Sequence, residues 1–280
     1  MRRIIADSGS TNVDWRILQP GCGTVRLLSP GINPVYMDGD SIRRAVSSAL
    51  EGYTDTPAEI YFYGAGITSP ESASKVVSAI APLFPEGTSV QSGSDLLGAA
   101  IALFGREEGL VTILGTGSNS GLYDGSAIID NIPAGGFILG DEGSGAYFGK
   151  CLLSDYLKRE MPAGLATALR DEFRLDYPSV VESVYRGGMP SRYLAGFMEF
   201  IGRNRREPYV RGLLHEGFCS FIRRNILKYC RSDLQMGIVG SVGMYFFEEI
   251  CCAAEECGVV PGRVARSAGD GLEEFYSMTL

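Results

Sequence analysis

Two glycine-rich turns in the middle of the sequence carry side chains suited to phosphate chemistry. The first, Gly115-Thr116-Gly117-Ser118-Asn119, follows the apolar run Val111 to Leu114. Glycines there let the backbone turn sharply and leave amides and hydroxyls accessible, which suits a phosphate. The second, Gly140-Asp141-Glu142-Gly143-Ser144-Gly145, adds two carboxylates able to hold a metal ion. Together the two turns predict phosphoryl transfer from a metal-bound nucleotide.

Each turn also has a purely structural interpretation. The first could be an ordinary hairpin tip, and the acids of the second could favour the start of the following helix. The order of the motifs favours the functional interpretation, because a similar strand, turn and strand lies near the start of the chain. Gly9 of that copy and Gly117 lie 108 positions apart, a spacing typical of a repeated domain. We therefore predict two related α/β halves that face each other across a cleft and clamp one triphosphate.

Asp95 is the predicted general base. It begins a helix through Phe104, just before the predicted crossing between the halves near Gly105 to Gly109, and domain junctions favour functional sites. The alternative is structural, because an aspartate in a first helical turn also satisfies amides and faces the helix dipole. The chain has one histidine, His215, predicted on a helix surface or interface, so multi-histidine metal sites are excluded and a carboxylate remains as the base.

Composition indicates an ordinary globular protein large enough for two domains. Of the 280 residues 45% are hydrophobic and 21% charged, and the net charge of −8 argues against a broad electrostatic grip on nucleic acid or acidic lipid. Arg2 and Arg3 precede only three apolar residues, and no later apolar run is long enough to span a bilayer. The seven cysteines show no CxxC spacing, which favours reduced thiols. We expect a cytoplasmic protein.

Strand and helix patterns alternate up to Tyr147, and the chain is then mainly helical. We predict a helix from Ser41 to Leu50 with Ser41 as its N-cap, and long helices over 191–204 and 209–230. A strand ending at Val239 leads into Gly240-Ser241-Val242-Gly243 and a further helix. This turn would let a flat ring lie against the backbone, or would serve close helix-to-sheet packing.

Four motifs follow the order of the phosphate-1, phosphate-2, hinge and adenosine elements of the actin-like ATPase and sugar-kinase superfamily. They are Asp7 to Thr11, Gly115 to Asn119, Gly140 to Gly145 and Gly240 to Gly243. Over nearly its whole length the chain most resembles the N-acetylglucosamine kinase and BadF/BadG/BcrA/BcrD ATPase group. This resemblance implies an α/β fold of two ribonuclease H-like domains flanking a cleft for ATP and Mg²⁺. The domains would be 1–107, completed by a helix over 270–280, and 108–269 with a helical insertion.

The resemblance also implies roles for individual residues. Asp7 would hold Mg²⁺ through water, and Asp95 matches the aspartate that takes the proton of the sugar hydroxyl. Asn33 matches an asparagine that contacts sugar in hexosamine kinases. The residues implied on the sugar side are Gly136, Phe137, Asp141 and Glu142, with Phe137 where animal N-acetylglucosamine kinases have tryptophan. The residues implied around the nucleotide are Ser8, Gly9, Ser10, Thr11, Gly115, Thr116, Gly117, Ser118, Asn119, Gly240, Ser241 and Gly243.

Three functions remain open from the sequence. The first is an ATP-dependent kinase that phosphorylates N-acetylglucosamine at its 6-hydroxyl, with a small-molecule sugar and neither nucleic acid nor membrane as partner; a homodimer is compatible with it. The second is an ATPase that activates a 2-hydroxyacyl-CoA dehydratase, but such proteins hold an iron–sulfur cluster through cysteines, and here Cys151 stands alone in its region. The third is a sensor that binds a sugar or nucleotide without catalysis.

Overall fold

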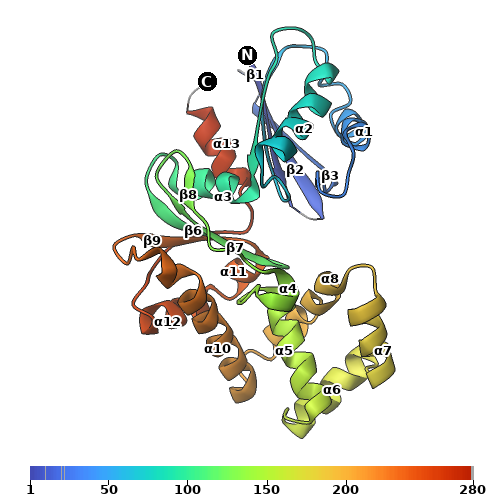
Figure 1. The fold of residues 1–280 in the computed structure, drawn as a ribbon, viewed down its shortest axis with the longest axis vertical. Helices are drawn as coiled ribbons and strands as arrows, with labels where there is room; N and C mark the ends of the chain where they lie inside the picture. The colour runs from blue at the N-terminus through green and yellow to red at the C-terminus, as the bar shows by residue number, and fades with distance from the viewer. Residues whose placement is uncertain (10, 20, 22, 279–280) are drawn as a thin grey trace. The chain divides into compact units, whose positions relative to one another are not determined.

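The computed structural model describes residues 1–280 except 10, 20, 22, 279 and 280. The chain forms two compact units, each built on a five-stranded sheet with helices (Figure 1). The first unit comprises Met1–Glu108, Tyr123–Ile128 and the segment from Ser267 onward. The second unit comprises Gly109–Leu122 and Ile129–Arg266.

The sheet of the first unit has the strand order β3-β2-β1-β4-β5. Its strands are β1 (Arg2–Ser8), β2 (Asn12–Gln19), β3 (Gly23–Pro30), β4 (Ala58–Gly64) and β5 (Ser89–Ser94). The first three strands form an antiparallel meander, and β4 and β5 continue the sheet in parallel with β1. Because side chains alternate along a strand, Ile4 and Ala6 enter one core while Asp7 faces the opposite side of the sheet.

Two pairs of helices cover the two faces of this sheet (Figure 1). They are α1 (Gly39–Ala49) with α2 (Pro70–Ile80), which continues into the short 3₁₀ turn η1 (Ala81–Leu83), and α3 (Asp95–Phe104) with α13 (Gly269–Ser277). The prediction of Ser41 as the cap of α1 was wrong. Asp38 has an extended backbone and its Oδ1 accepts from the backbone amide of Ser41 at 2.8 Å, so the helix begins one turn earlier.

The sheet of the second unit repeats the strand order of the first. Its strands are β6 (Gly109–Leu114), β7 (Ser118–Tyr123), β8 (Ile128–Asp130), β9 (Gln235–Val239) and β10 (Val260–Ala265), in the order β10-β9-β6-β7-β8. Taken in chain order, β6 to β10 occupy the places of β1 to β5, and β9 and β10 again run parallel to the first strand. This confirms the predicted α/β fold built from two related halves.

Helices dominate the rest of the second unit (Figure 1). They are α4 (Gly136–Leu139), α5 (Gly145–Lys158), α6 (Ala163–Phe173), α7 (Tyr177–Val181), the π-helical turn η2 (Glu182–Arg186), α8 (Pro190–Ala195), α9 (Met198–Arg203), α10 (Pro208–Arg224), the 3₁₀ turn η3 (Ile226–Tyr229), α11 (Ser241–Tyr245) and α12 (Phe247–Glu256). Their apolar faces form one large core with β6 and β9, in which Phe148, Phe218 and Phe246 are fully buried.

Two long helices of the sequence prediction are interrupted. The segment 191–204 divides at Gly196 into α8 and α9, where the Leu194 carbonyl approaches α5 so closely that any side chain at Gly149 would overlap it. The segment 209–230 leaves the α-helix at Asn225, whose side-chain amide donates to the Phe221 carbonyl at 3.1 Å. The backbone amide of Asn225 donates to the same carbonyl at 2.9 Å, and the chain continues as η3.

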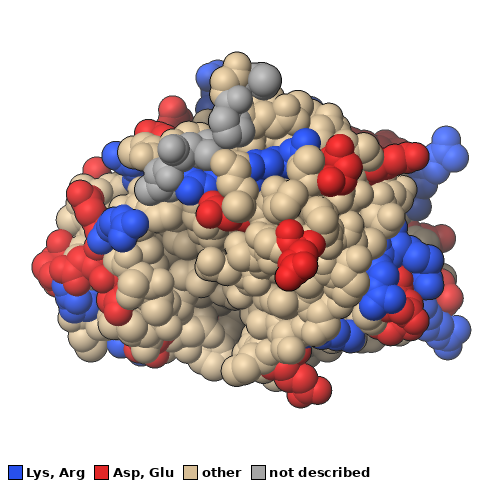
Figure 2. Space-filling model, turned by 90° about the horizontal axis from the view of Figure 1, so that it is seen from above, with Lys and Arg blue, Asp and Glu red and all other residues tan. Residues whose placement is uncertain are grey.

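None of the described helices combines the length and the apolar character needed to cross a membrane. Over the face drawn in Figure 2, basic and acidic side chains are interspersed and separated by uncharged areas. Charges of both signs are therefore mixed on the part of this face that is drawn in colour.

Candidate functional site

The first unit places three carboxylates near one another. Asp7 near the end of β1 pairs in register with Asp14 on β2, so the two side chains lie on the same face of the sheet. Asp95 is the first residue of α3, which packs beside β4, and its charge acts on Asp7. The structure therefore brings the predicted metal residue and the predicted base into one electrostatic neighbourhood.

Burial raises the pKa of Asp7 and of Asp95. The pKa of Asp7 is raised from 3.8 to about 6, and burial is the largest cause. A hydrogen bond from the Ala268 amide at 3.0 Å lowers this pKa, the charges of Asp14 and Asp95 raise it, and the charge of Arg16 lowers it. Burial likewise raises the pKa of Asp95. A bound cation would offset this repulsion, and carboxylate oxygens suit Mg²⁺, which one or two carboxylates hold together with waters.

The N-cap of α3 is Ser94, the residue before Asp95. The hydroxyl of Ser94 accepts from the Leu97 amide at 3.1 Å, which makes Ser94 the N-cap of α3. Asp95 accepts from the Leu96 amide at 2.8 Å. The glycine that follows has a packing role, because a Cβ on Gly98 would lie 2.7 Å from Cβ of Tyr63 on β4.

Asn33 lies in a loop that a buried serine holds in place. The hydroxyl of Ser8 donates to the Ile32 carbonyl at 2.9 Å and accepts from the Ile32 amide at 3.2 Å. Oδ1 of Asn33 accepts from the Val35 amide at 2.9 Å, and any side chain on Gly66 would overlap it. Ser8 therefore positions the Asn33 loop in this structure. The predicted contact of Ser8 with phosphate stays a prediction.

The turn after β1 is a tight hairpin. The amide of Gly9 donates to the Asn12 carbonyl at 3.0 Å, and Thr11 is exposed. Ser10, predicted beside the phosphates, lies outside the described residues.

In the second unit the two glycine-rich turns of the sequence analysis touch each other. The first amides of α5 pair with the turn after β6: Gly145 donates to the Gly115 carbonyl at 2.8 Å and Ala146 to the Thr116 carbonyl at 3.0 Å. Residues of the predicted phosphate-2 and hinge elements thus form one structure, in which Thr116 is exposed.

Asp141 joins the same two turns from the other side. Its Oδ1 accepts from the Ser118 amide at 3.3 Å, and a Cβ on Gly117 would lie 3.1 Å from its Oδ2. Asp141 itself has a left-handed backbone with φ of 55°. Burial raises its pKa and the Ser118 amide lowers it, with Glu142 raising and Lys150 lowering it to a smaller extent.

The other predicted sugar-side residues lie around these turns with different surroundings. Glu142 is buried, and its Oε1 lies 2.8 Å from Nε of Arg224. Phe137 on α4 accepts from Nζ of Lys150 through its carbonyl at 2.8 Å, and both residues line a largely apolar pocket of about 610 Å³. Gly136 is exposed. Asn119, predicted beside the nucleotide, accepts through its Oδ1 from the Asn131 side chain at 3.0 Å.

The predicted adenosine element lies against the start of the phosphate-2 turn. Gly240, with φ of 129°, packs so closely on Leu114 that a side chain would overlap its carbonyl oxygen. Ser241 is exposed at a pocket of about 620 Å³ that also contains Met198, Tyr245 and Arg266. Close packing therefore accounts for the glycine, while the neighbouring pocket is wide enough for a purine-sized ligand.

The packing at Gly240 gives a stability prediction. We expect Gly240→Ala to lower the free energy of unfolding by about 2–4 kcal/mol, because it combines overlap with the Leu114 carbonyl and a left-handed backbone. Gly212→Ala, in the interior of α10 with open space around the new methyl group, is the matched control and should raise stability by up to about 1 kcal/mol. Urea unfolding measures both, and equal midpoints for the two variants would refute the argument.

Sequence reasoning missed several residues of these sites. Asp14 and Arg16 were detectable from strand alternation, since Val13 and Trp15 enter the core and the residues between and after them must face Asp7. Arg16 is buried and bonds both oxygens of Asp14, at 2.9 and 2.7 Å. Tyr245 and its pocket gave no comparable signal, because the pocket forms from helices far apart in the sequence.

No protein-family model and no curated protein matches this chain. Among solved structures, one from Porphyromonas gingivalis, described as a candidate N-acetylglucosamine kinase, is 38% identical, with a TM-score of 0.90 and 98% of both chains covered. A candidate N-acetylglucosamine kinase from Chromobacterium violaceum is 17% identical, with a TM-score of 0.75 and 98% of both chains covered. A glucokinase of the ROK family from Streptomyces griseus, solved with glucose and AMPPNP, is 16% identical, with a TM-score of 0.54 and 99% of both chains covered. The latter two show a shared fold.

Proposed function

This chain belongs to the N-acetylglucosamine kinase family, and from that membership we infer that it is an ATP-dependent sugar kinase. We propose N-acetylglucosamine as the acceptor and its 6-hydroxyl as the group that is phosphorylated. The observation that supports the proposal is the neighbourhood of Asp7 on β1 and Asp95 on α3, the carboxylates proposed to hold the metal and to accept the proton.

The proposed reaction needs little covalent help from the protein. Transfer of a γ-phosphoryl group depends on charge neutralisation and alignment, and one carboxylate near the acceptor hydroxyl suffices as a base. Asp95 would accept that proton, and burial supports this role because it raises the pKa of Asp95 toward the range of a working base. Asn33, Phe137 and Asp141 would bind the sugar, with Gly136 and Glu142 beside them.

The residues present fit ATP and Mg²⁺. The acidic group of Asp7, Asp14 and Asp95 offers the hard oxygen donors that Mg²⁺ prefers, and Mg²⁺ when bound would neutralise charge on the phosphates. Asp7 would orient its waters. In the second unit, Thr116 and Gly117 would donate to phosphates, and the pocket beside Ser241 and Tyr245 would take the adenine. Gly9, Thr11 and Ser10 would supply the phosphate contacts of the first unit, in the clamp that the sequence predicts.

We propose that the two compact units are the family's two domains, with the division predicted at 107/108 and the terminal helix completing the first. The packing of α13 on β1, β2 and α3 supports that completion.

An ADP-release assay over a panel of sugars tests the function. With ATP and Mg²⁺, we expect N-acetylglucosamine to stimulate ADP release well above the rate without sugar, and more than glucose or anhydro-sugars do. The 6-deoxy analogue should inhibit without being phosphorylated, which isolates the role of the 6-hydroxyl. Equal ADP release with and without every sugar would refute a sugar kinase, whereas stimulation by another sugar alone would refute only the proposed acceptor.

Two other functions stay testable with the same protein. An ATPase that activates a dehydratase would show iron-dependent visible absorption after anaerobic purification. A sensor would bind ATP and sugar in calorimetry without releasing ADP. Neither has a supporting observation comparable to the paired acids of β1 and α3.

A further inference from the structure

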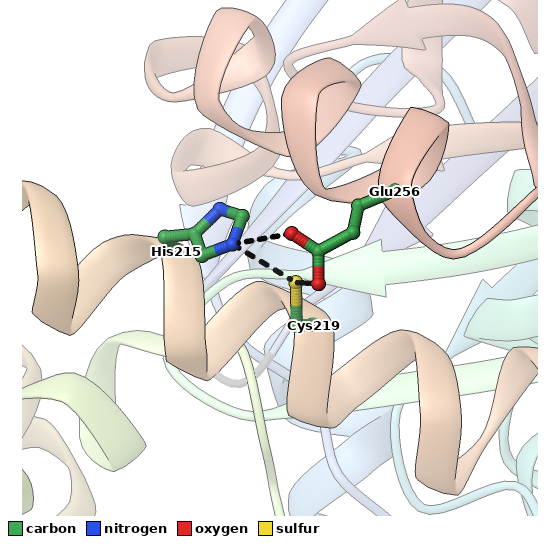
Figure 3. Close-up of side chains that lie close together, drawn as sticks. All are labelled: His215, Cys219 and Glu256. Atoms are coloured by element: carbon green, nitrogen blue, oxygen red, sulfur yellow. Dashed lines mark hydrogen bonds and ion pairs between the residues drawn. The ribbon is translucent and has the colours of Figure 1, made fainter.

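A second group of side chains able to bind a metal ion lies in the second unit, between α10 and α12. His215 and Cys219 are one turn apart on α10, and Glu256 is the last residue of α12 (Figure 3). One donor atom from each residue lies within 4.8 Å of the other two. None of these residues belongs to the motifs assigned to nucleotide or sugar.

The three donor atoms point toward one another. Nε2 of His215 lies 2.9 Å from Oε2 of Glu256 and 3.7 Å from Sγ of Cys219, and Sγ lies 3.9 Å from Oε1 of Glu256 (Figure 3). Tetrahedral zinc with ordinary bond lengths would place nitrogen and oxygen about 3.3 Å apart and sulfur about 3.5 Å from either. The carboxylate contacts the imidazole through Oε2 and the thiol through Oε1, so coordination of one ion requires a rotation of the Glu256 carboxylate as well as small shifts of the other two donors.

The contacts do not suit a proton relay for a nucleophilic cysteine. Such a relay needs the carboxylate and the thiol on opposite nitrogens of the imidazole. Here both contact Nε2, and Cys219 is only 2% exposed. An imidazole, a thiol and a carboxylate that converge from three side chains can instead bind a metal ion.

The helix dipole at the end of α12 favours a cation at this place, whereas the positive charge of Arg223 beside Glu256 opposes one. Glu256 ends α12, where the helix dipole is negative. Nη2 of Arg223 donates to Oε1 of Glu256 at 2.6 Å, which leaves Oε2 toward the histidine and resembles the outer hydrogen bonds that orient metal-bound carboxylates. Cys257 follows directly and interacts with the Cys219 thiol, so a second sulfur lies beside the cluster. Imidazole, thiolate and carboxylate together suit zinc rather than Mg²⁺ or Ca²⁺.

We propose that His215, Cys219 and Glu256 bind one Zn²⁺ ion that fastens α10 to α12, with water or Cys257 in the fourth position. Binding requires loss of the Cys219 proton to solvent, so each ion bound releases it. The role is structural, since the three ligands come from packed helices whose neighbouring residues Phe218 and Ala253 belong to the core.

The competing interpretation is an ordinary surface ion pair. His215 and Glu256 side chains are 44% and 49% exposed, and an exposed pair with Arg223 would contribute little to stability. That interpretation leaves the buried thiol without a reason to face the imidazole and the carboxylate. The two interpretations differ in a direct measurement, because an ion pair holds no zinc.

Zinc titration of tag-free, chelator-treated protein against a chromophoric competitor tests the proposal. We expect about one tight zinc site per chain. His215→Gln and Glu256→Gln should each lower the zinc affinity by more than about 100-fold, because even residues that only hydrogen-bond to metal ligands typically contribute 10–100-fold. Both residues are partly exposed, so the variants should fold. Glu255→Gln and Cys252→Ser are the matched controls, because both positions lie exposed on α12 outside the cluster. They should keep wild-type affinity.

Cobalt(II) gives a second readout on the same proteins. The wild type and both controls should show thiolate-to-cobalt charge transfer and the strong visible bands of tetrahedral cobalt, and Cys219→Ala should lose the charge-transfer band. Zinc should also raise the unfolding temperature of the wild type but not of His215→Gln. Absence of a tight site, or equal affinity in the wild type and in His215→Gln and Glu256→Gln, would overturn the proposal.

Discussion

Asp95→Asn should lower kcat for sugar phosphorylation by about 10²–10⁴-fold, the usual contribution of a general base. Asparagine keeps the size and the hydrogen bond from the Leu96 amide, so α3 and its Ser94 cap should remain intact. ATP and sugar affinities should stay within a few-fold of the wild type. Coupled ADP release and calorimetry of each ligand give the two quantities separately.

The matched control for this variant is Asp40→Asn. Asp40 is also an acid in the first turn of a helix, α1, but it is exposed. It should retain full activity. If Asp95→Asn kept more than about a tenth of wild-type kcat, well short of the contribution of a base, Asp95 would be a structural residue and the assignment of the base would have to move.

Asp7→Asn should abolish Mg²⁺-dependent turnover and at the same time stabilise the metal-free protein. The pKa of Asp7 is raised from 3.8 to about 6, so the folded state binds the proton more tightly than the unfolded state. Ionisation of Asp7 lowers the free energy of unfolding. This loss is absent below about pH 4, grows as the pH rises through about 6, and is complete above that value. A shift of this size corresponds to an upper limit of about 3 kcal/mol, which partial exposure reduces.

The measurement is denaturant unfolding in EDTA across pH 4 to 8. The wild type should lose stability as pH rises, and Asp7→Asn should lack that part of the loss and be more stable at pH 7. Asparagine can still accept from the Ala268 amide, so α13 keeps its contact. Asp55→Asn, at an exposed acid of the same unit, should follow the wild-type curve. A variant less stable than the wild type at pH 7 would show that Asp7 serves the fold instead.

The fold was predictable where local signals agree with tertiary packing. The repeat of strand, glycine turn and strand at Gly9 and Gly117 indicated two related halves, and the matching strand orders of the two sheets confirm it. Helix boundaries were less predictable, because a side chain such as that of Asp38 can accept from a backbone amide one turn before the expected cap. Such a contact depends on the side-chain rotamer, which the hydrophobic periodicity of the sequence does not determine.

The candidate sites were predictable in part for a related reason. Motif order located Asp7, Asp95 and the turn at Gly115, and their roles stay predictions. Asp141 accepts from the Ser118 amide and has a left-handed backbone although it is not a glycine, which no sequence pattern indicates. Glu142 in the turn before α5 pairs with Arg224 of α10, and the cluster around His215 joins α10 to α12, so the proximity of these residues follows only from packing.

The return of the chain to its first unit has a consequence for biosynthesis. The second unit lies between the two main parts of the first, and α13 follows it in the chain. A nascent chain must therefore hold one face of the β1–β2 sheet and the Asp7 carboxylate uncovered until the whole second unit has left the ribosome. Chaperone capture during translation should accordingly concentrate on the amino-terminal half, although domains more often mature in the order in which they are made.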